Sequence, residues 1–170
     1  PYFYTSTLIK VKPLLITKEE TFQPAYSPDG KEVAFLENRT TLRIINLKTK
    51  KIRTVLLGDK NYSYIDGDQW FKWSPDGKWL LVTYIDKCRW GAAEVGLVDV
   101  SGKKKVINLT NSGYDDESPK WVMNGEIMIW ASDMMGYRSH GSWGAEYDIY
   151  GMFFTKEAYD RFMLNKADYE

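Results

Sequence analysis

The sequence is poor in two residue types that often build catalytic and metal sites. It has one cysteine, Cys88, and one histidine, His140, in 170 residues. A single cysteine excludes an internal disulfide and any metal cluster built on cysteines. A lone histidine has no second ligand at a telling spacing. These shortages predict no metal site and no cofactor.

Excess charge of either sign is also absent, because Lys plus Arg and Asp plus Glu each number 23. A neutral balance gives no general attraction to nucleic acid, to a membrane surface or to an acidic substrate. No apolar run approaches the roughly 18 residues that a membrane-spanning helix needs. The composition therefore predicts neither nucleic acid binding nor insertion into a membrane.

An initiator methionine and a signal peptide are missing as well, and the opening residues, PYFYTSTLIKVKPLL, look like the middle of a β-sheet. We therefore expect a piece of a longer protein, whose targeting information lies in another part. Residues 8–16 are expected to form an outer strand of a preceding structural unit.

One short phrase occurs twice, as YSPDGKE at residues 26–32 and WSPDGKW at residues 73–79. Its two serines are 47 residues apart, and a weaker third copy, WVMNGEI at residues 121–127, follows after a further 48 residues. In Ser-Pro-Asp-Gly, serine suits the first position of a β-turn and proline fixes φ at the second, while aspartate and glycine suit the last two. Because an apolar stretch follows each copy, each phrase predicts a tight turn between two antiparallel strands.

Further strand-like stretches complete each repeat: LRIINLK and KIRTVLL after the first turn, EVGLVDVS and KKVINLT after the second. Four short strands in each period of 47 or 48 residues predict an all-β fold, a partial β-propeller of about three four-stranded antiparallel blades. The expected units are an outer strand (1–17), three blades (18–64, 65–111 and 112–154) and a helical tail (155–170). A β-sandwich with two similar hairpins is the alternative, although it has no reason to keep a whole-blade period.

The tail changes from strand to helix spacing. Thr155 is a plausible N-cap, and Ala158, Tyr159, Phe162 and Met163 then form an apolar stripe of helical period. This helix stands where the fourth strand of the third blade should begin. It is expected either to cover the edge of the sheet or to lead into the next segment.

The repeats resemble those of the TolB and tricorn-protease group of β-propellers. The resemblance rests on SPDGKEVAF, SPDGKWLLV and EYDIYGMFF and extends from Phe22 to Phe154. The final stretch, HGSWGAEYDIYGMFFTKEAYDRFMLNKADYE, is similar to the propeller part of bacterial tricorn-like serine peptidases. In such enzymes the propellers precede a PDZ-like module and a separate peptidase domain.

The resemblance implies a non-catalytic module that guides or filters peptide substrates or supports assembly, in the periplasm or otherwise exported. No peptidase motif can be placed on this chain, so no catalytic residue is carried over. A TolB-like scaffold that binds a partner protein is one alternative, and a glycan- or small-ligand-binding propeller or propeller enzyme is the other. A ring usually needs at least four blades, so open strand edges are also expected to favour self-association.

The loops fall into two sets when they are assigned to the two faces of a propeller. The turns within each hairpin are short, whereas the connections at residues 57–68, 85–93, 110–117 and 134–145 are long and rich in side chains. We call the surface formed by these four connections the long-loop face. Long loops on a rigid scaffold are the usual place for binding, so a ligand is expected there.

Five residues of the long-loop face are the candidate ligand-binding residues: Arg138, Trp143, Tyr114, His140 and Trp90. The guanidinium of Arg138 suits a carboxylate such as a peptide C-terminus, and Trp143 is a large anchor with few rotatable bonds. His140 fits a local hydrogen bond better than a catalytic role, because no nucleophile and acid can be assigned beside it. Trp90 and Trp143 each suit either an anchor or packing over their own blade.

Two other groups are interpreted as structural. The run Tyr114–Glu117 contains three carboxylates and could bind a cation or a peptide amino end, but a solvated acidic loop is favoured because consecutive side chains diverge. Trp73 and Trp121 precede equivalent turns, and we expect both to pack between strands.

Overall fold

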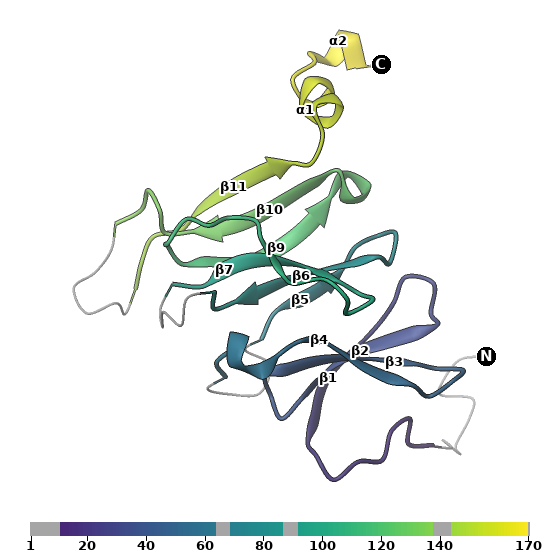
Figure 1. Ribbon diagram of the computed structural model, residues 1–170. Helices are drawn as coiled ribbons and strands as arrows, with labels where there is room; N and C mark the ends of the chain where they lie inside the picture. The colour runs from purple at the N-terminus through teal and green to yellow at the C-terminus, as the bar shows by residue number, and fades with distance from the viewer. Residues whose placement is uncertain (1–10, 64–68, 87–91, 138–143, 170) are drawn as a thin grey trace, which may run out of the picture.

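The computed structural model describes residues 11–63, 69–86, 92–137 and 144–169. Three antiparallel sheets lie one after another in chain order, with two short helices beyond the third (Figure 1). The strands of sheet 1 are β1 (Thr21–Tyr26), β2 (Glu32–Glu37), β3 (Thr41–Asn46) and β4 (Ile52–Leu56). Those of sheet 2 are β5 (Phe71–Trp73), β6 (Trp79–Tyr84), β7 (Glu94–Asp99) and β8 (Ile107–Asn108).

Sheet 3 contains β9 (Asp116–Val122), β10 (Ile127–Ser132) and β11 (Asp148–Phe153). The remaining elements are the 3₁₀ turns η2 (Gly58–Lys60) and η3 (Met123–Gly125) and the helices α1 (Lys156–Phe162) and α2 (Lys166–Tyr169). Each sheet is a meander, in which every strand pairs with its neighbour in sequence. This repetition confirms the predicted partial β-propeller with a short C-terminal helix, and the exact unit boundaries stay a prediction.

The two Ser-Pro-Asp-Gly phrases form the same turn in sheets 1 and 2. The side chain of Ser27 donates to Asp29 (2.8 Å), and its Oγ accepts the backbone N–H of Glu32 (3.0 Å). Ser74 repeats both bonds 47 residues later, with distances of 2.6 and 3.0 Å. The hydrogen bond from Ser27 is the main cause that lowers the pKa of Asp29 to about 2. These turns therefore hold the same place in two successive blades.

Sheet 2 is buried on both faces. Adjacent residues Leu80 and Leu81 of β6 are each 0% exposed although their side chains point in opposite directions. Leu80 packs in the cluster shared with sheet 1, whereas Leu81 packs with Met128 of sheet 3. A two-layer sandwich would leave one of these neighbours facing solvent, so three stacked layers exclude that alternative.

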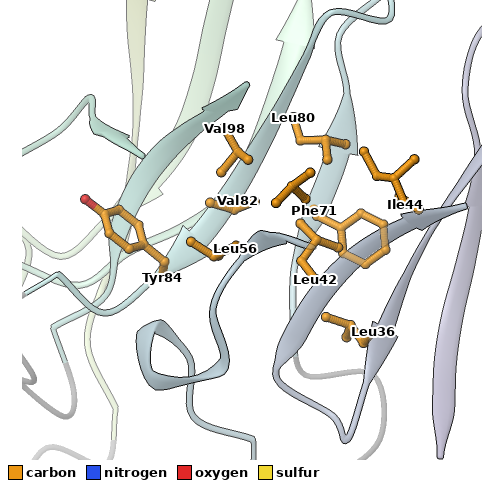
Figure 2. Packing of buried hydrophobic residues seen from close by; sticks show 11 residues of the cluster. Leu36, Leu42, Ile44, Leu56, Phe71, Leu80, Val82, Tyr84 and Val98 are labelled. Carbon is orange, nitrogen blue, oxygen red and sulfur yellow. The ribbon is translucent and has the colours of Figure 1, made fainter. Parts of the chain in front are cut away.

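The larger core lies between sheets 1 and 2 (Figure 2). Apolar side chains of alternate strand positions point into it, as expected from the period of two in a β-strand. Its labelled members are Leu36, Leu42, Ile44, Leu56, Phe71, Leu80, Val82, Tyr84 and Val98. Burial of the phenol and the negative charges of Asp86 and Glu94 raise the pKa of Tyr84.

Equivalent tryptophans link each blade to the one before it. The indole N–H of Trp73 donates to the carbonyl of Ala25 (3.1 Å), and that of Trp121 donates to the carbonyl of Lys72 (3.3 Å). Donor and acceptor are 48 and 49 residues apart, about one repeat. Trp73 also packs against the core between sheets 1 and 2. The expectation that Trp73 and Trp121 are structural is therefore confirmed.

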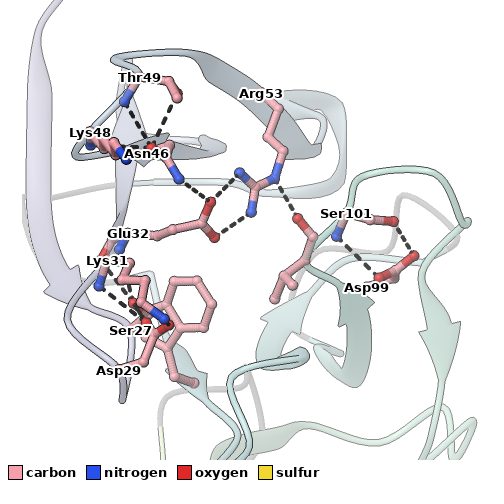
Figure 3. Close-up of polar contacts among 12 residues, drawn as sticks. Ser27, Asp29, Lys31, Glu32, Asn46, Lys48, Thr49, Arg53, Asp99 and Ser101 are labelled. Carbon is pink, nitrogen blue, oxygen red and sulfur yellow. Dashed lines mark hydrogen bonds and ion pairs between the residues drawn. The ribbon is translucent and has the colours of Figure 1, made fainter.

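A polar bridge joins sheets 1 and 2 beside the short turns (Figure 3). Arg53 of β4 forms a two-pronged ion pair with Glu32 of β2, at 2.8 and 2.6 Å. Its Nε donates to the carbonyl of Val100, the residue after β7 of sheet 2 (2.6 Å). The hydrogen bond from Arg53 lowers the pKa of Glu32 despite partial burial. A planar guanidinium suits this double role because its N–H groups point in fixed directions.

The tail forms the predicted helix. The hydroxyl of Thr155 accepts the N–H of Ala158 (3.1 Å), so Thr155 is the N-cap of α1. Phe153 of β11 contacts Tyr159 and Phe162 of α1, with ring centroids 5.3 and 5.2 Å away. Ala158 is buried, but Phe162 stays 61% exposed. The helix thus covers only part of the outer face of sheet 3.

Two strand predictions differ from the structure. Residues 11–20 contain no strand, although an outer strand was expected to extend to Ile16. Pro13 lacks the N–H that a ladder requires, and the segment instead lays Leu15 on the outer face of sheet 1. The last strand of sheet 2 is only Ile107–Asn108. The exposed run Lys103–Lys105 before it favours solvent over pairing.

Candidate ligand-binding face

The described parts of the long loops contact one another. The N–H of Ile85 donates to the carbonyl of Lys60 (2.7 Å), which joins the connections after β4 and β6. The Asn108 side chain donates to the carboxylate of Asp86 (3.3 Å), which ties the end of sheet 2 to the same place. The described parts of the connections after β4 and β6 are therefore held together beside the end of sheet 2.

Four of the five predicted ligand-binding residues lie outside the described residues: Trp90, Arg138, His140 and Trp143. Tyr114 is described, is half-buried, and donates its backbone N–H to the hydroxyl of Ser112 (3.0 Å). Its position on the long-loop face agrees with the predicted surface. Its role in binding stays a prediction.

Asp115 is the point where three long loops meet. Its carboxylate accepts the N–H of Ala93 (3.2 Å) from the loop before β7 and the hydroxyl of Tyr147 (2.7 Å) from the loop before β11. Its own N–H donates to the Oδ1 of Asp133, just after β10 (3.0 Å). The carboxylate and the N–H of Asp115 thereby connect segments that are far apart in sequence.

Asp116 corrects the interpretation of the acidic run as a solvated loop. It is 1% exposed and begins strand β9. Its two carboxylate oxygens accept from the hydroxyl of Ser112 (2.5 Å) and from the indole N–H of Trp130 (3.1 Å). A buried carboxylate needs such donors because desolvation otherwise makes its charge costly. The pairing of β9 with β10 turns this side chain inward, and the sequence did not indicate where β9 begins.

Glu94 holds the loop of residues 110–113 by hydrogen bonds. It was not identified from the sequence. It is 7% exposed, and its carboxylate accepts the N–H groups of Ser112 and Gly113, each at 3.0 Å, and the hydroxyl of Thr110 (2.7 Å). A glutamate at the start of the apolar stretch EVGLVDV was the available signal, because a charge at a buried strand end requires partners.

We call Glu94, Asp115, Asp116, Glu117 and Asp133 the acidic cluster. Partial desolvation of the carboxyl group, followed by the negative charges of Asp115 and Asp133, raises the pKa of Glu117. Burial, the hydrogen bond to Asp115 and nearby negative charges raise the pKa of Tyr147. This part of the long-loop face therefore carries a negative potential, which favours a cationic group over an anionic one.

Within the described ranges, no group of three or more His, Cys, Asp or Glu side chains is placed to hold a metal ion. N–H and O–H donors already occupy oxygens of Glu94, Asp115 and Asp116.

Among the helices described, none is long and apolar enough to cross a membrane.

Solved structures share this arrangement of sheets. The tricorn protease matches with a TM-score of 0.60 at 12% identity, over 80% of this chain and 14% of that one. A protein designated TolB from Agrobacterium tumefaciens matches with a TM-score of 0.55 at 20% identity, over 81% of this chain and 46% of that one. The propeller domain of the Trilobed protease from Pyrococcus furiosus matches with a TM-score of 0.52 at 16% identity, over 80% of this chain and 41% of that one. The chain therefore has the fold of part of a β-propeller, like those of the tricorn protease and TolB.

One curated relative is similar in sequence. A protein of Sulfurisphaera tokodaii designated a tricorn-like protease C-terminal subunit is 28% identical over 106 residues, which is 62% of this chain. The chain spans only 11% of the length of that relative. No protein-family model matches the chain.

Glu117→Gln is expected to raise the melting temperature slightly at neutral pH. The folded state raises the pKa of Glu117, so it binds a proton more readily than the unfolded chain, and the charged form opposes folding. Stability should therefore fall as pH rises from the ordinary glutamate pKa through the raised one, and the variant should lack this contribution. The gain should stay below about 1 kcal/mol because Glu117 keeps contact with solvent.

Thermal melts of both proteins between pH 4 and pH 8 measure the Glu117 effect. Glu20→Gln is the control, because Glu20 is exposed and precedes sheet 1. Equal pH profiles for the Glu117→Gln variant and the parent would show that the carboxyl of Glu117 titrates normally.

Proposed function

We propose that this chain is a non-catalytic propeller module of a tricorn-like serine peptidase, in which it guides or filters peptide substrates or supports assembly. The relative designated a tricorn-like protease subunit carries the proposal, at 28% identity over 106 residues. The propeller fold, which the tricorn protease shares, agrees with it. The peptidase chemistry would reside in another part of the protein. Export to the periplasm is part of the same proposal, as the family resemblance implies.

The long-loop face is the proposed contact surface for the peptide. Three of its loops meet at Asp115, so an anchoring side chain there has a fixed support. The negative acidic cluster suits a peptide amino end or a basic side chain. Arg138 would meet the carboxylate of the peptide, Trp143 would supply apolar surface, and Tyr114 would add a further contact.

The test compares long and short peptides in the full-length protein. Trp143→Ala and Arg138→Ala should each lower kcat/KM for a long peptide by about thirtyfold, the effect of losing a true anchor. A short peptide that reaches the peptidase without the propeller should be cleaved as before. Lys48→Ala, on the opposite short-turn side, is the matched control.

Two results would contradict the guiding role. Unchanged kinetics combined with a lower melting temperature for Trp143→Ala would mean that this loop is scaffold. Hydrolysis of peptides by the isolated 170-residue chain, lost on His140→Ala, would mean that the chain is itself catalytic.

A TolB-like scaffold that binds a partner protein is the second candidate. The TolB protein from Agrobacterium tumefaciens shares the fold, with 81% of this chain covered. A full-length protein that has no peptidase domain and binds a protein through the long-loop face would favour this candidate. A glycan or small ligand bound on that face is the third possibility.

Self-association through the open ends is the last part of the proposal. The outer face of sheet 3 leaves Ile149 72% exposed and Phe162 61% exposed. On sheet 1, Leu14 and Tyr26 line a hollow over the outer face, and Tyr26 is 68% exposed. Exposed apolar groups of this size often mark contact surfaces. Sedimentation velocity of the full-length protein over a concentration series measures the assembly.

A further inference from the structure

A second open surface lies on the outer rim between sheets 1 and 2. One wall is β4 and the residue after it, Thr54–Leu57, and the other is the segment Gly102–Val106 that leads into β8. Lys60 and Asp86 complete the lining, and the volume is about 620 Å³. We call this surface the interblade groove. Its volume is in the range of ligand sites, roughly 300–1,000 Å³.

The two walls touch at one end of the interblade groove. A Cβ on Gly102 would lie 2.7 Å from the carbonyl oxygen of Thr54, and Gly102 has a φ of +71°. Only glycine fits this approach without strain. At the other end, Leu57 is 62% exposed beside Lys60. The groove is therefore closed at Gly102, and its other end lies at Leu57 and Lys60.

The floor of the interblade groove is apolar. Val55 and Leu56 of β4 are buried, and Val106 on the opposite wall is half-buried. β4 is also the last strand of sheet 1, so one of its edges pairs with no strand in the described part of the chain. A strand edge beside apolar side chains can hold an extended peptide.

The rim is strongly positive in a protein of zero net charge. Lys60 and the exposed run Lys103–Lys105 surround the groove, with Asp86 as the one acidic residue of the lining. Lys104 lies 5.2 Å from the ring of Trp79. Within the described ranges no salt bridge forms at these four lysines. Lys60 donates to the backbone carbonyl of Asp86 (3.4 Å). Hydrogen bonds from Ser101, and then the charges of Lys104 and Lys103, lower the pKa of Asp99.

We infer that the interblade groove binds an acidic extended peptide segment. An apolar side chain of the peptide packs on Val55 and Val106, and the carboxylates of the peptide lie beside the lysines. An apolar floor favours a peptide, which has apolar side chains to place on it, over the phosphate backbone of a nucleic acid. Charge complementarity also favours acidic over neutral peptides. The acidic cluster on the long-loop face prefers the opposite charge, so the two surfaces select different sequences. The inference holds whether or not the protein is a peptidase.

The test uses the full-length protein and a fluorescein-labelled peptide of alternating Glu and Val, with a peptide of alternating Lys and Val as the charge control. Lys103→Gln, Lys104→Gln and Lys105→Gln combined should weaken binding of the acidic peptide by about tenfold, because each surface charge contributes modestly. The matched control combines Lys48→Gln, Lys50→Gln and Lys51→Gln. These lysines form the corresponding basic turn of sheet 1, and the groove lining does not include them.

Fluorescence anisotropy gives the affinities, and hydrogen–deuterium exchange locates the bound peptide. Support requires a loss in the groove variant, little change in the control variant, and slower exchange in residues 52–57 and 102–107. Equal losses in both variants would mean general charge attraction and overturn the inference. So would protection confined to the long-loop face, no binding of the acidic peptide, or tighter binding of a single-stranded oligonucleotide than of the peptide.

Discussion

Leu80→Ala and Leu81→Ala should each lower the free energy of unfolding by about 2–5 kcal/mol, the range measured for buried leucines. Both side chains are 0% exposed on opposite faces of β6. Each truncation removes apolar contacts and leaves a cavity between two rigid sheets. A domain has a total stability of roughly 5–15 kcal/mol, so either change is expected to remove a large part of it.

Denaturant unfolding of the two leucine variants also tests the layer arrangement. Leu164→Ala, at a 45% exposed leucine after α1, is the control and should change stability by less than about 0.5 kcal/mol. In a two-layer sandwich only one of the adjacent leucines would be costly to remove. A near-zero effect for either Leu80→Ala or Leu81→Ala would therefore contradict three stacked layers.

The fold was predictable because its signals are local and repeated. The turns at Ser27 and Ser74 depend on side chains within five residues of each serine, so the phrase itself contains the hydrogen bonds. The N-cap at Thr155 is equally local. The period of 47 residues then predicted that the sheets stack on one another. A repeated meander buries both of its faces only by stacking on its copies.

The acidic cluster could not be predicted from the sequence, because the burial of its carboxylates depends on strand pairing. Asp115, Asp116 and Glu117 are consecutive, yet Asp116 is turned inward to Trp130 while Glu117 is exposed. That alternation follows from the start of β9, which the sequence did not locate. The interblade groove was missed for a similar reason. Its walls, β4 and Gly102–Val106, are separated by most of a blade and meet only when sheets 1 and 2 stack.

Asp116→Ala should lower the free energy of unfolding by about 2–4 kcal/mol. The substitution removes the acceptor of Ser112 and of the Trp130 indole at a site that is 1% exposed. Hydrogen bonds to a charged group contribute about 1.5–3 kcal/mol each, and unsatisfied buried donors add a penalty. The substitution also removes the cost of burying a charged carboxylate, which offsets part of this loss. Asp148→Ala is the control, because Asp148 is exposed on β11.

A double-mutant cycle with Ser112→Ala separates the hydrogen bond from the charge. If the bond at 2.5 Å is the main contribution, the two losses should overlap, and the double variant should be only slightly less stable than Asp116→Ala alone. Fully additive losses would instead assign the cost to the carboxylate and to Trp130. Ser112 also accepts the N–H of Tyr114, so loosening this contact should speed hydrogen exchange in residues 111–116. Asp116 would then act on the long-loop face by holding Tyr114 in place rather than by touching a ligand.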